Sequence, residues 1–211
     1  MVQLGLLAVV IDYEGVALDE FVDWYEEEHL PERVEIPGFL TATRWMATNE
    51  GSYSLGLYDL DGLGVLNDAA YRAVSPDNRS PWTNRIIGQV SGTSRYVALQ
   101  ESPGDAVGPE DAGAVFLVRF DTKPDQQRGL AAWFEDEHLR RVTQVPGVLL
   151  ARRFGTVGAA DHGQLITYHL RSPEVMSEEA WRTLTDPDWS SMVGVGPWGQ
   201  DCMVFERPAG R

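Results

Sequence analysis

Two continuous runs of apolar residues occupy matching places in the two halves of the chain. Leu4–Ile11 reads LGLLAVVI and Ala114–Phe120 reads AVFLVRF, and an aspartate follows each run. A continuous apolar run of this length is typical of a strand that is covered on both faces. We therefore expect each half to begin with a buried strand.

An amphipathic pattern follows each of these runs. In the first half, apolar and aromatic residues recur at spacings of three and four over 18–30, which predicts a helix with one side packed on the core. This side carries Leu18, Phe21, Tyr25 and His29. The second half repeats it with Leu130, Phe134 and His138.

The remaining segments predict more strands and a second helix in each half. The turn signals Pro37-Gly38 and Pro146-Gly147 each precede a short apolar run. In the first half the strands are expected at 39–45, 53–60 and 95–100, and the second helix at 63–74. In the second half the strands are expected at 148–154, 164–170 and 202–206, and the helix at 173–184. Each half therefore has the ferredoxin-like order β-α-β-β-α-β.

An internal repeat relates the two halves. Trp24–Trp45 (WYEEEHLPERVEIPGFLTATRW) aligns without a gap with Trp133–Phe154 (WFEDEHLRRVTQVPGVLLARRF), at an offset of 109 residues and with ten of 22 positions identical. A repeat of such a long period indicates duplicated structural units. We expect an α+β chain with halves at 1–101 and 114–211, joined by a linker over 102–113 that is rich in Pro, Gly and acidic residues.

The uncovered faces of the two predicted sheets indicate how the halves assemble. A four-stranded sheet with both helices on one face leaves an apolar face exposed. Packing the two sheets face to face buries both of these faces within one chain. We therefore expect an intrachain barrel of two ferredoxin-like halves, a monomer with an internal pseudo-dimer, for which further dimerisation stays open.

Composition narrows the classes of partner. The net charge of −15 argues against binding to nucleic acid or to an anionic membrane, because these partners need clustered Lys and Arg. The longest apolar run, Leu4–Ile11, is too short to span a bilayer. The single cysteine, Cys202, excludes an internal disulfide and suits a reducing compartment. These features predict a cytoplasmic protein.

With these residues placed, the chain resembles the dimeric α+β barrel superfamily, and within it the EthD-like proteins. The segments WYEEEHLPERVEIPGF, YSLGLYDL and AYRAVSPDNRSPWT carry the resemblance along the first half, whereas the second half ends in AWRTLTDPDWSSMVGVGPW. The resemblance implies two ferredoxin-like halves packed sheet to sheet, with a small-molecule cavity between sheet and helices. It selects no single reaction, because relatives include polyketide cyclases, muconolactone isomerases and cofactor-free monooxygenases that form quinones.

The repeated histidines His29 and His138 are the first catalytic candidates. Each follows an aromatic residue of the apolar side by four positions, so its imidazole should face the cavity. A neighbouring glutamate, Glu28 in the first half, could raise the pKa of the imidazole, and histidine readily exchanges protons near neutral pH. A structural role at the helix C-terminus stays equally open, because both halves keep the residue.

Other polar residues complete the candidate site. Arg44 and Arg153 lie in phase with apolar residues of a strand, and each either binds an anionic group or pairs with the acidic first helix. Asp59 and His169 occupy the same position of the two halves, so the site should have diverged there. We expect the more open pocket in the first half, lined by Tyr25, His29, Arg44, Tyr58, Asp59 and Trp82. The catalytic candidates are His29, Tyr58, Asp59 and His138, and further substrate-binding candidates are Tyr53, Tyr71, Arg153 and His169.

These candidates favour a cofactor-independent lyase, isomerase or cyclase that acts on an apolar or aromatic, polyketide-like molecule by histidine acid–base chemistry. A cofactor-free monooxygenase of phenols and a non-catalytic binding or scaffold protein are the alternatives. The chain has no HExxH, paired CxxC, P-loop or GxGxxG motif, so we expect no metal and no cofactor. Tandem halves of the superfamily can hold haem, but nothing in this sequence marks an axial histidine.

Overall fold

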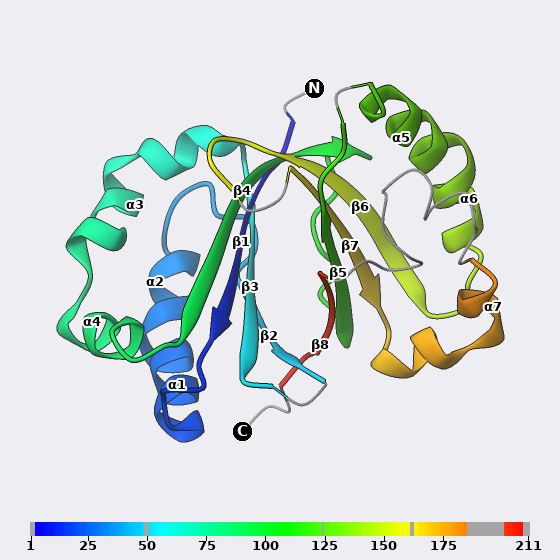
Figure 1. Ribbon diagram of the computed structural model, residues 1–211. Coiled ribbons are helices and arrows are strands. Elements are labelled where there is room, and N and C mark those ends of the chain that lie inside the picture. The colour runs from blue at the N-terminus through cyan, green and yellow to red at the C-terminus, as the bar shows by residue number, and fades with distance from the viewer. Residues whose placement is uncertain (1–2, 49–50, 124, 161–162, 185–200, 209–211) are drawn as a thin grey trace.

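The strands form one closed antiparallel barrel with helices packed on two opposite sides (Figure 1). The computed structural model describes residues 3–48, 51–123, 125–160, 163–184 and 201–208. Within them the barrel has the strand order β1-β3-β2-β8-β5-β7-β6-β4. The strands are β1 (Gly5–Asp12), β2 (Thr43–Ala47), β3 (Tyr53–Leu60), β4 (Gly92–Ser102), β5 (Ala114–Phe120), β6 (Val148–Thr156), β7 (Gln164–Leu170) and β8 (Cys202–Glu206).

Each half contributes four neighbouring strands, and the edge strands of the halves pair with one another. Strand β2 pairs with β8 through Met46 opposite Glu206, and β4 pairs with β6 through Leu99 opposite Gly155. These two pairings leave no free sheet edge, which removes the exposed backbone groups of an edge strand. The predicted fold class, two ferredoxin-like halves joined as an intrachain α+β barrel, is confirmed.

Each half carries its long helix on the outer face of its own strands. In the first half this helix runs through α1 (Leu18–Trp24), a π-helical turn (Tyr25–His29) and α2 (Leu30–Val34). In the second half it runs through α5 (Gln127–Trp133), a π-helical turn (Phe134–His138) and α6 (Leu139–Val142). The first helix therefore continues about one turn beyond 18–30, the range predicted for it. In both halves the histidine closes the π-helical turn, a feature frequent at functional sites.

The second helical region differs from the prediction in the first half. The segment 63–74 contains only a 3₁₀ turn (Leu63–Asn67) and the short α3 (Ala69–Arg72), and a further turn spans Pro76–Asn78. An additional helix, α4 (Pro81–Ile87), follows where the sequence suggested a loop. Ser80 accepts a hydrogen bond from the Thr83 backbone amide at 2.9 Å, so Ser-Pro was an N-terminal helix signal that the periodicity did not reveal.

The second half has the matching 3₁₀ turn (Pro173–Ser177) and α7 (Glu179–Arg182). The segment 173–184, for which one continuous helix was predicted, therefore contains two short helical elements instead. The divergent segment that ends at Pro197-Trp198 lies outside the described residues. Among the residues that are described, no helix combines the length and the apolar character needed to cross a membrane.

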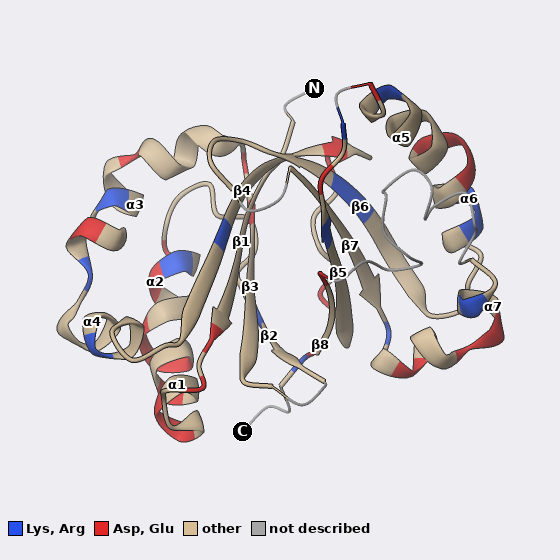
Figure 2. Cartoon of the chain, viewed as in Figure 1, with Lys and Arg blue, Asp and Glu red and all other residues tan. Residues whose placement is uncertain are grey.

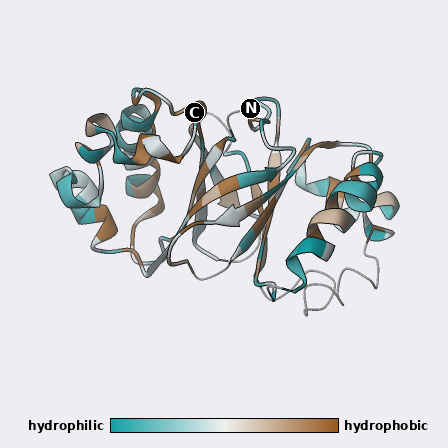
Figure 3. Ribbon diagram, turned by 90° about the horizontal axis from the view of Figure 1, so that it is seen from above, coloured by the Kyte–Doolittle hydropathy of each residue, from teal (hydrophilic) through white to brown (hydrophobic). Residues whose placement is uncertain are grey.

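Alternation along the strands divides the core into three parts. One side chain of each consecutive pair points into the barrel, where Leu57, Phe154 and Phe205 pack together from both halves. The other side chain points to the helices, as Tyr58 does in the first half and Tyr168 does in the second. Seen from above, strands with many hydrophobic residues lie between two groups of helices that carry many hydrophilic residues (Figure 3). Charged residues likewise gather on the helices more than on the strands (Figure 2).

Candidate functional site

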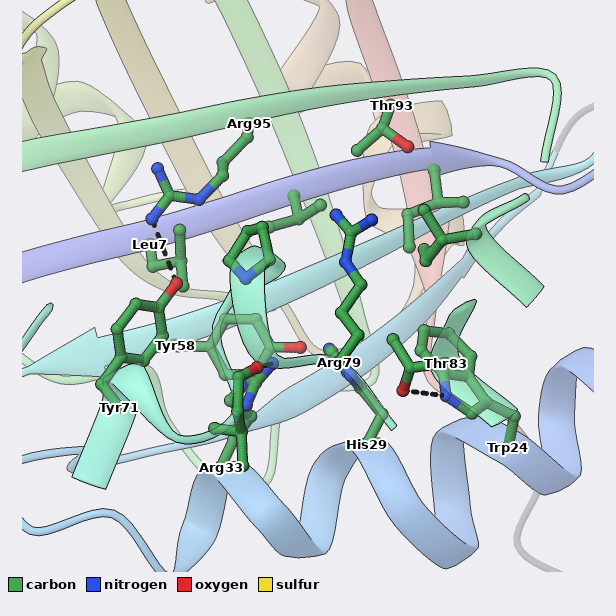
Figure 4. A pocket seen from close by; sticks show the side chains of 15 residues that line it. Leu7, Trp24, His29, Arg33, Tyr58, Tyr71, Arg79, Thr83, Thr93 and Arg95 are labelled. Atoms are coloured by element: carbon green, nitrogen blue, oxygen red, sulfur yellow. Dashed lines mark hydrogen bonds between the residues drawn. The ribbon is translucent and has the colours of Figure 1, made fainter. Parts of the chain in front are cut away.

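A cavity of about 100 Å³ lies between the sheet and the helices of the first half (Figure 4). Its volume is on the order of the ~150 Å³ apolar cavity that holds benzene in another protein. Strands β1, β3 and β4 form its floor, and the long helix, α3 and α4 surround it. Its lining comprises Leu7, Val9, Ile11, Trp24, His29, Arg33, Tyr58, Tyr71, Val74, Pro76, Arg79, Thr83, Ile87, Thr93 and Arg95.

Among the titratable residues that line this cavity, His29 is the candidate for proton transfer. The π-helical turn places its ring 4.6 Å from the ring of Trp24 and 5.0 Å from that of Tyr25, measured between centroids. Its Nδ1 is buried and has no hydrogen-bond partner among the described residues. Because Nδ1 has almost no accessible surface, a ligand would have to exchange a proton or a hydrogen bond with the other ring nitrogen, Nε2.

The pKa of His29 is lowered to about 3, first by burial and then by the positive charges of Arg33 and Arg79. The expectation that Glu28 raises this pKa was wrong. The carboxylate of Glu28 accepts hydrogen bonds from the hydroxyls of Ser80 at 2.6 Å and Thr83 at 2.8 Å, so it anchors α4 and not the imidazole. His29 is therefore neutral in the folded protein at neutral pH.

Two tyrosines supply hydroxyl groups beside His29. The hydroxyls of Tyr25 and Tyr58 lie 3.3 Å apart, and Gly56 makes room for both, because a Cβ there would come within 2.5 Å of the Tyr25 hydroxyl. Burial holds the pKa of Tyr58 well above its usual value. At neutral pH Tyr58 is therefore a protonated phenol, which can donate a hydrogen bond, and not an anion.

The corresponding site of the second half has different hydrogen bonding. The Nε2 atom of His138 lies 2.8 Å from the hydroxyl of Tyr168, and the His138 ring stacks on Trp133. Phe134 stands where the first half has Tyr25, so Tyr168 cannot form the tyrosine pair seen in the first half. Its hydroxyl bonds to the histidine instead. The loss of one hydroxyl therefore explains why the two repeated histidines differ in their surroundings.

Asp59 and His169 lie in a second polar cluster inside the barrel and not beside His29. Arg152 donates from Nη1 to Asp59 Oδ1 at 2.6 Å, and its Nη2 lies 2.9 Å from His169 Nε2. Asp59 Oδ2 also accepts from the Thr41 hydroxyl at 2.9 Å and from the Gly108 amide at 2.8 Å. The cluster borders a separate cavity of about 420 Å³.

The prediction that Asp59 shares a pocket with Tyr58 and His29 was wrong in geometry. Adjacent strand residues point to opposite faces, so Tyr58 reaches the helices while Asp59 reaches the barrel interior. Arg152, the centre of this cluster, was not among the site residues predicted from the sequence. The alternation of side chains along a strand could have identified Arg152. Arg153 was predicted to face the helices, so the residue before it must face the inside of the barrel.

The other predicted binding residues also lie apart from the His29 cavity, with one exception. Arg44 pairs with Glu26 of the first helix at 2.6 Å, and Arg153 pairs with Glu101 of β4. Trp82 packs in the cluster between α1 and α4, and Tyr53 packs against the barrel core. Tyr71 does line the cavity, and Tyr25 contributes only the hydroxyl behind Tyr58.

Neither a metal nor a haem finds a matching set of ligands among the described residues. No group of three or more His, Cys, Asp and Glu side chains comes together there in a way that could hold a metal ion. The volume around His29 suits one aromatic ring and not a porphyrin, and His138 already uses Nε2 for its contact to Tyr168. We therefore derive no step that involves either group.

Comparison with solved structures supports the fold. An anthrone oxidase-like protein superposes with a TM-score of 0.68 at 11% identity, over 100% of this chain and 93% of that one. A proposed monooxygenase from Lactobacillus acidophilus gives 0.66 at 8% identity, over 98% and 95%. A mutant chlorite dismutase from Candidatus Nitrospira defluvii gives 0.64 at 10% identity, over 98% and 91%. No protein-family model and no curated protein matches the sequence. At these identities the likeness establishes the dimeric α+β barrel fold and nothing about the reaction.

The buried charge cluster gives a first test of stability. Asp59→Asn removes the counter-charge of Arg152 inside the barrel, where Arg152 is 0% exposed, and should lower the free energy of unfolding by about 3–5 kcal/mol. Glu20→Gln is the matched control, because the Arg85–Glu20 pair has a similar separation of 2.8 Å but side chains that are 56% and 36% exposed. That change should cost only about 0–1 kcal/mol. Urea unfolding followed by tryptophan fluorescence measures both, and equal losses would contradict the assignment of burial as the cause.

The second test concerns pH. Burial and the nearby Arg141 lower the pKa of His138 from 6.5 to about 4, so the unfolded chain binds the proton more readily than the folded one. The neutral form of His138 therefore contributes its full share to the free energy of unfolding above pH 6.5. As the pH falls towards 4, this free energy decreases by up to roughly 3 kcal/mol. His138→Gln should flatten this part of the stability profile in urea titrations at pH 7, 5.5 and 4.5. An unchanged slope would show that other groups control acid unfolding.

Proposed function

We propose that this protein is a small-molecule enzyme in which His29 removes a proton from an aromatic or enolisable substrate bound in the first-half cavity. The observation that carries this proposal is the neutral imidazole of His29, which lines a cavity of the size of one aromatic ring. A positioned histidine contributes roughly 100-fold or more to a proton transfer when its pKa lies near the working pH. The pKa of about 3 in the empty cavity must therefore rise when the substrate binds. In the second half Nε2 of His138 already contacts Tyr168, which favours a single site.

The surroundings of His29 suit the negative charge that deprotonation creates. Tyr58 lines the cavity as a protonated phenol, and a hydrogen bond from its hydroxyl would stabilise an enolate or phenolate oxygen. Apolar side chains such as Leu7 and Val9 lower the local polarity and strengthen this interaction. The proposed roles are therefore proton acceptor for His29 and oxyanion donor for Tyr58.

In the proposed reaction the C–H or O–H electron pair stays on the substrate and the proton moves to His29. Return of the same proton to another carbon gives an isomerase, and attack of the carbanion on a carbonyl within the substrate gives a cyclase. Loss of a leaving group from the adjacent carbon gives a lyase. All three reactions need only the groups that the cavity supplies, which supports a cofactor-independent mechanism.

A monooxygenase is the second candidate, and the named structural neighbours favour it. The anthrone oxidase-like protein and the proposed monooxygenase share this fold over nearly the whole chain. Here the substrate anion would itself reduce dioxygen: a CH₂ group and O₂ give C=O and H₂O, so no further reductant is needed. The EthD-like assignment of the first-half motifs belongs to the same proposal and does not separate the two reactions.

We also propose that one chain suffices for the active unit. Both sheet edges are already paired within the chain, so closure needs no second copy. We propose half boundaries at 1–101 and 114–211, and the end of strand β4 at Ser102 and the start of β5 at Ala114 support this division. Cytoplasmic action would suit a chain with a single cysteine, Cys202.

The experiment compares His29→Gln with its repeat-related control His138→Gln. A panel of hydroxylated aromatics and enolisable ketones is incubated with each protein in D₂O, and deuterium incorporation is followed by NMR while an oxygen electrode records O₂ uptake. We expect His29→Gln to lower the rate by about 100-fold or more and His138→Gln to lower it by less than about threefold.

The two readouts also separate the candidate reactions. Exchange or product formation without O₂ uptake identifies the isomerase, lyase or cyclase, and O₂ consumption equal to product formation identifies the monooxygenase. Equal losses in both variants would refute a single site in the first half. Ligand binding without turnover across the panel would favour the non-catalytic binding protein.

A further inference from the structure

Three arginines, Arg33, Arg79 and Arg95, line the His29 cavity, and no aspartate or glutamate is among its lining residues. This arrangement is unexpected in a chain with a net charge of −15. The three guanidinium groups come from separate elements, since Arg33 lies on α2, Arg95 on β4, and Arg79 between the Pro76–Asn78 turn and α4 (Figure 4). Positive charge is therefore concentrated at this one cavity by the fold and not by a run in the sequence.

Arg33 is buried without a complete set of partners. The residue is 7% exposed, and its Nη2 donates to the backbone oxygen of Val74 at 3.0 Å. Its Nη1 is buried and has no hydrogen-bond partner, and the carboxylate of Glu32, at 3.9 Å, is too distant for a hydrogen bond. A buried guanidinium with an unsatisfied donor is costly unless a ligand completes it.

Arg79 and Arg95 have no ion-pair partner in the part of the chain that the structure describes. Arg95 donates from Nη2 to the hydroxyl of Tyr71 at 3.2 Å, which orients its guanidinium over the cavity and leaves its remaining donors available. Arg95 is exposed and Arg79 is half-buried, so they lie nearer the solvent than Arg33. The charges thus extend from the entrance to the buried end of the cavity.

The second half lacks this set of charges. Val142 stands at the repeat position of Arg33. Cys202 stands at that of Arg95, since Val9 faces Arg95 across its strand pair as Val118 faces Cys202. Trp181 likewise replaces Tyr71. Arg141, next to Val142, makes a contact like that of Arg33, from Nη2 to the backbone oxygen of Thr183 at 3.2 Å, but its side chain is exposed. One arginine near the histidine is therefore common to both halves, whereas the buried Arg33 and the pair Arg79 and Arg95 distinguish the first half.

We infer that the first-half cavity binds the carboxylate of a small aromatic acid, with its ring beside Trp24, Tyr58 and Tyr71 and its carboxylate held by Arg79 and Arg95. The fork of a guanidinium matches the two oxygens of a carboxylate, and the apolar and aromatic lining matches one ring. This inference deepens the proposed function by naming the substrate class of the same site, but it concerns binding and does not require turnover.

Such a ligand would also make His29 a better base. The charges of Arg33 and Arg79 are among the causes that keep the imidazole neutral in the empty cavity. A bound carboxylate offsets these charges, which favours protonation of the ring when the substrate is present. The same arginines thus serve recognition and prepare the proton transfer.

The test measures binding of benzoate and of its neutral counterpart benzamide by isothermal titration calorimetry at low ionic strength. Arg79→Gln and Arg95→Gln change partly exposed side chains and should leave the fold intact, which circular dichroism checks. Each should weaken benzoate binding by about 10-fold or more and change benzamide binding by less than about twofold. Arg72→Gln is the control, because Arg72 is an exposed arginine of α3 outside the cavity lining and the charge change is the same.

Three outcomes would overturn the inference. These are equal affinities of the wild-type protein for benzoate and benzamide, equal effects of Arg72→Gln and Arg95→Gln, and binding of inorganic phosphate as tight as that of benzoate. Benzoate binding that depends on the arginines, without any turnover in the His29 experiment, would support the inference and refute the proposed function. If neutral phenols are turned over at rates that the arginine substitutions leave unchanged, the proposed function is supported and the inference is refuted.

Discussion

The mutual burial of two apolar sheet faces is the interaction on which the whole structure depends. Leu57 of the first half, Phe154 of the second and Phe205 of the last strand meet in one core that neither sheet could form alone. Burial of such side chains contributes roughly 1.5–3 kcal/mol each and drives the faces together. Pairing of β2 with β8 and of β4 with β6 then closes the ring, so that hydrophobic packing and backbone hydrogen bonding agree on the same arrangement.

Because the inner faces of the sheets are committed to this core, chemistry in the first half is left with the layer between sheet and helices. Strand alternation enforces the division: Tyr58 and Asp59 are neighbours in sequence, yet one reaches the His29 cavity and the other the Arg152 cluster. The inner cluster joins Arg152, Asp59 and His169 by hydrogen bonds, although Arg152 Nε and His169 Nδ1 have no partner. The outer cavity combines a histidine with an apolar and aromatic lining of the size of one ring, which is why we assign recognition and proton transfer to it.

Duplication gave the two halves the same scaffold and allowed them to diverge at few positions. Tyr25 became Phe134, and with the lost hydroxyl the partner of the strand tyrosine changed from a second tyrosine to His138. Arg33 became Val142, which removed a buried charge from the equivalent position. Both changes make the second half more apolar and more self-contained. Burial of the barrel core needs both halves, whereas the proposed site needs only the first.

The sequence by itself determined the repeat, the order of strands and the assembly of two ferredoxin-like halves, because periodicity and burial are local properties that recur in both copies. It also named His29, Tyr58 and Tyr71 as candidates, and these three line one cavity. It missed α4 and the inward Arg152, and it grouped Asp59 with the wrong neighbours. The tertiary structure alone decided these points, since which face a strand residue occupies, and which distant arginines surround a histidine, depends on the closure of the barrel and on the packing of α3 and α4 against it.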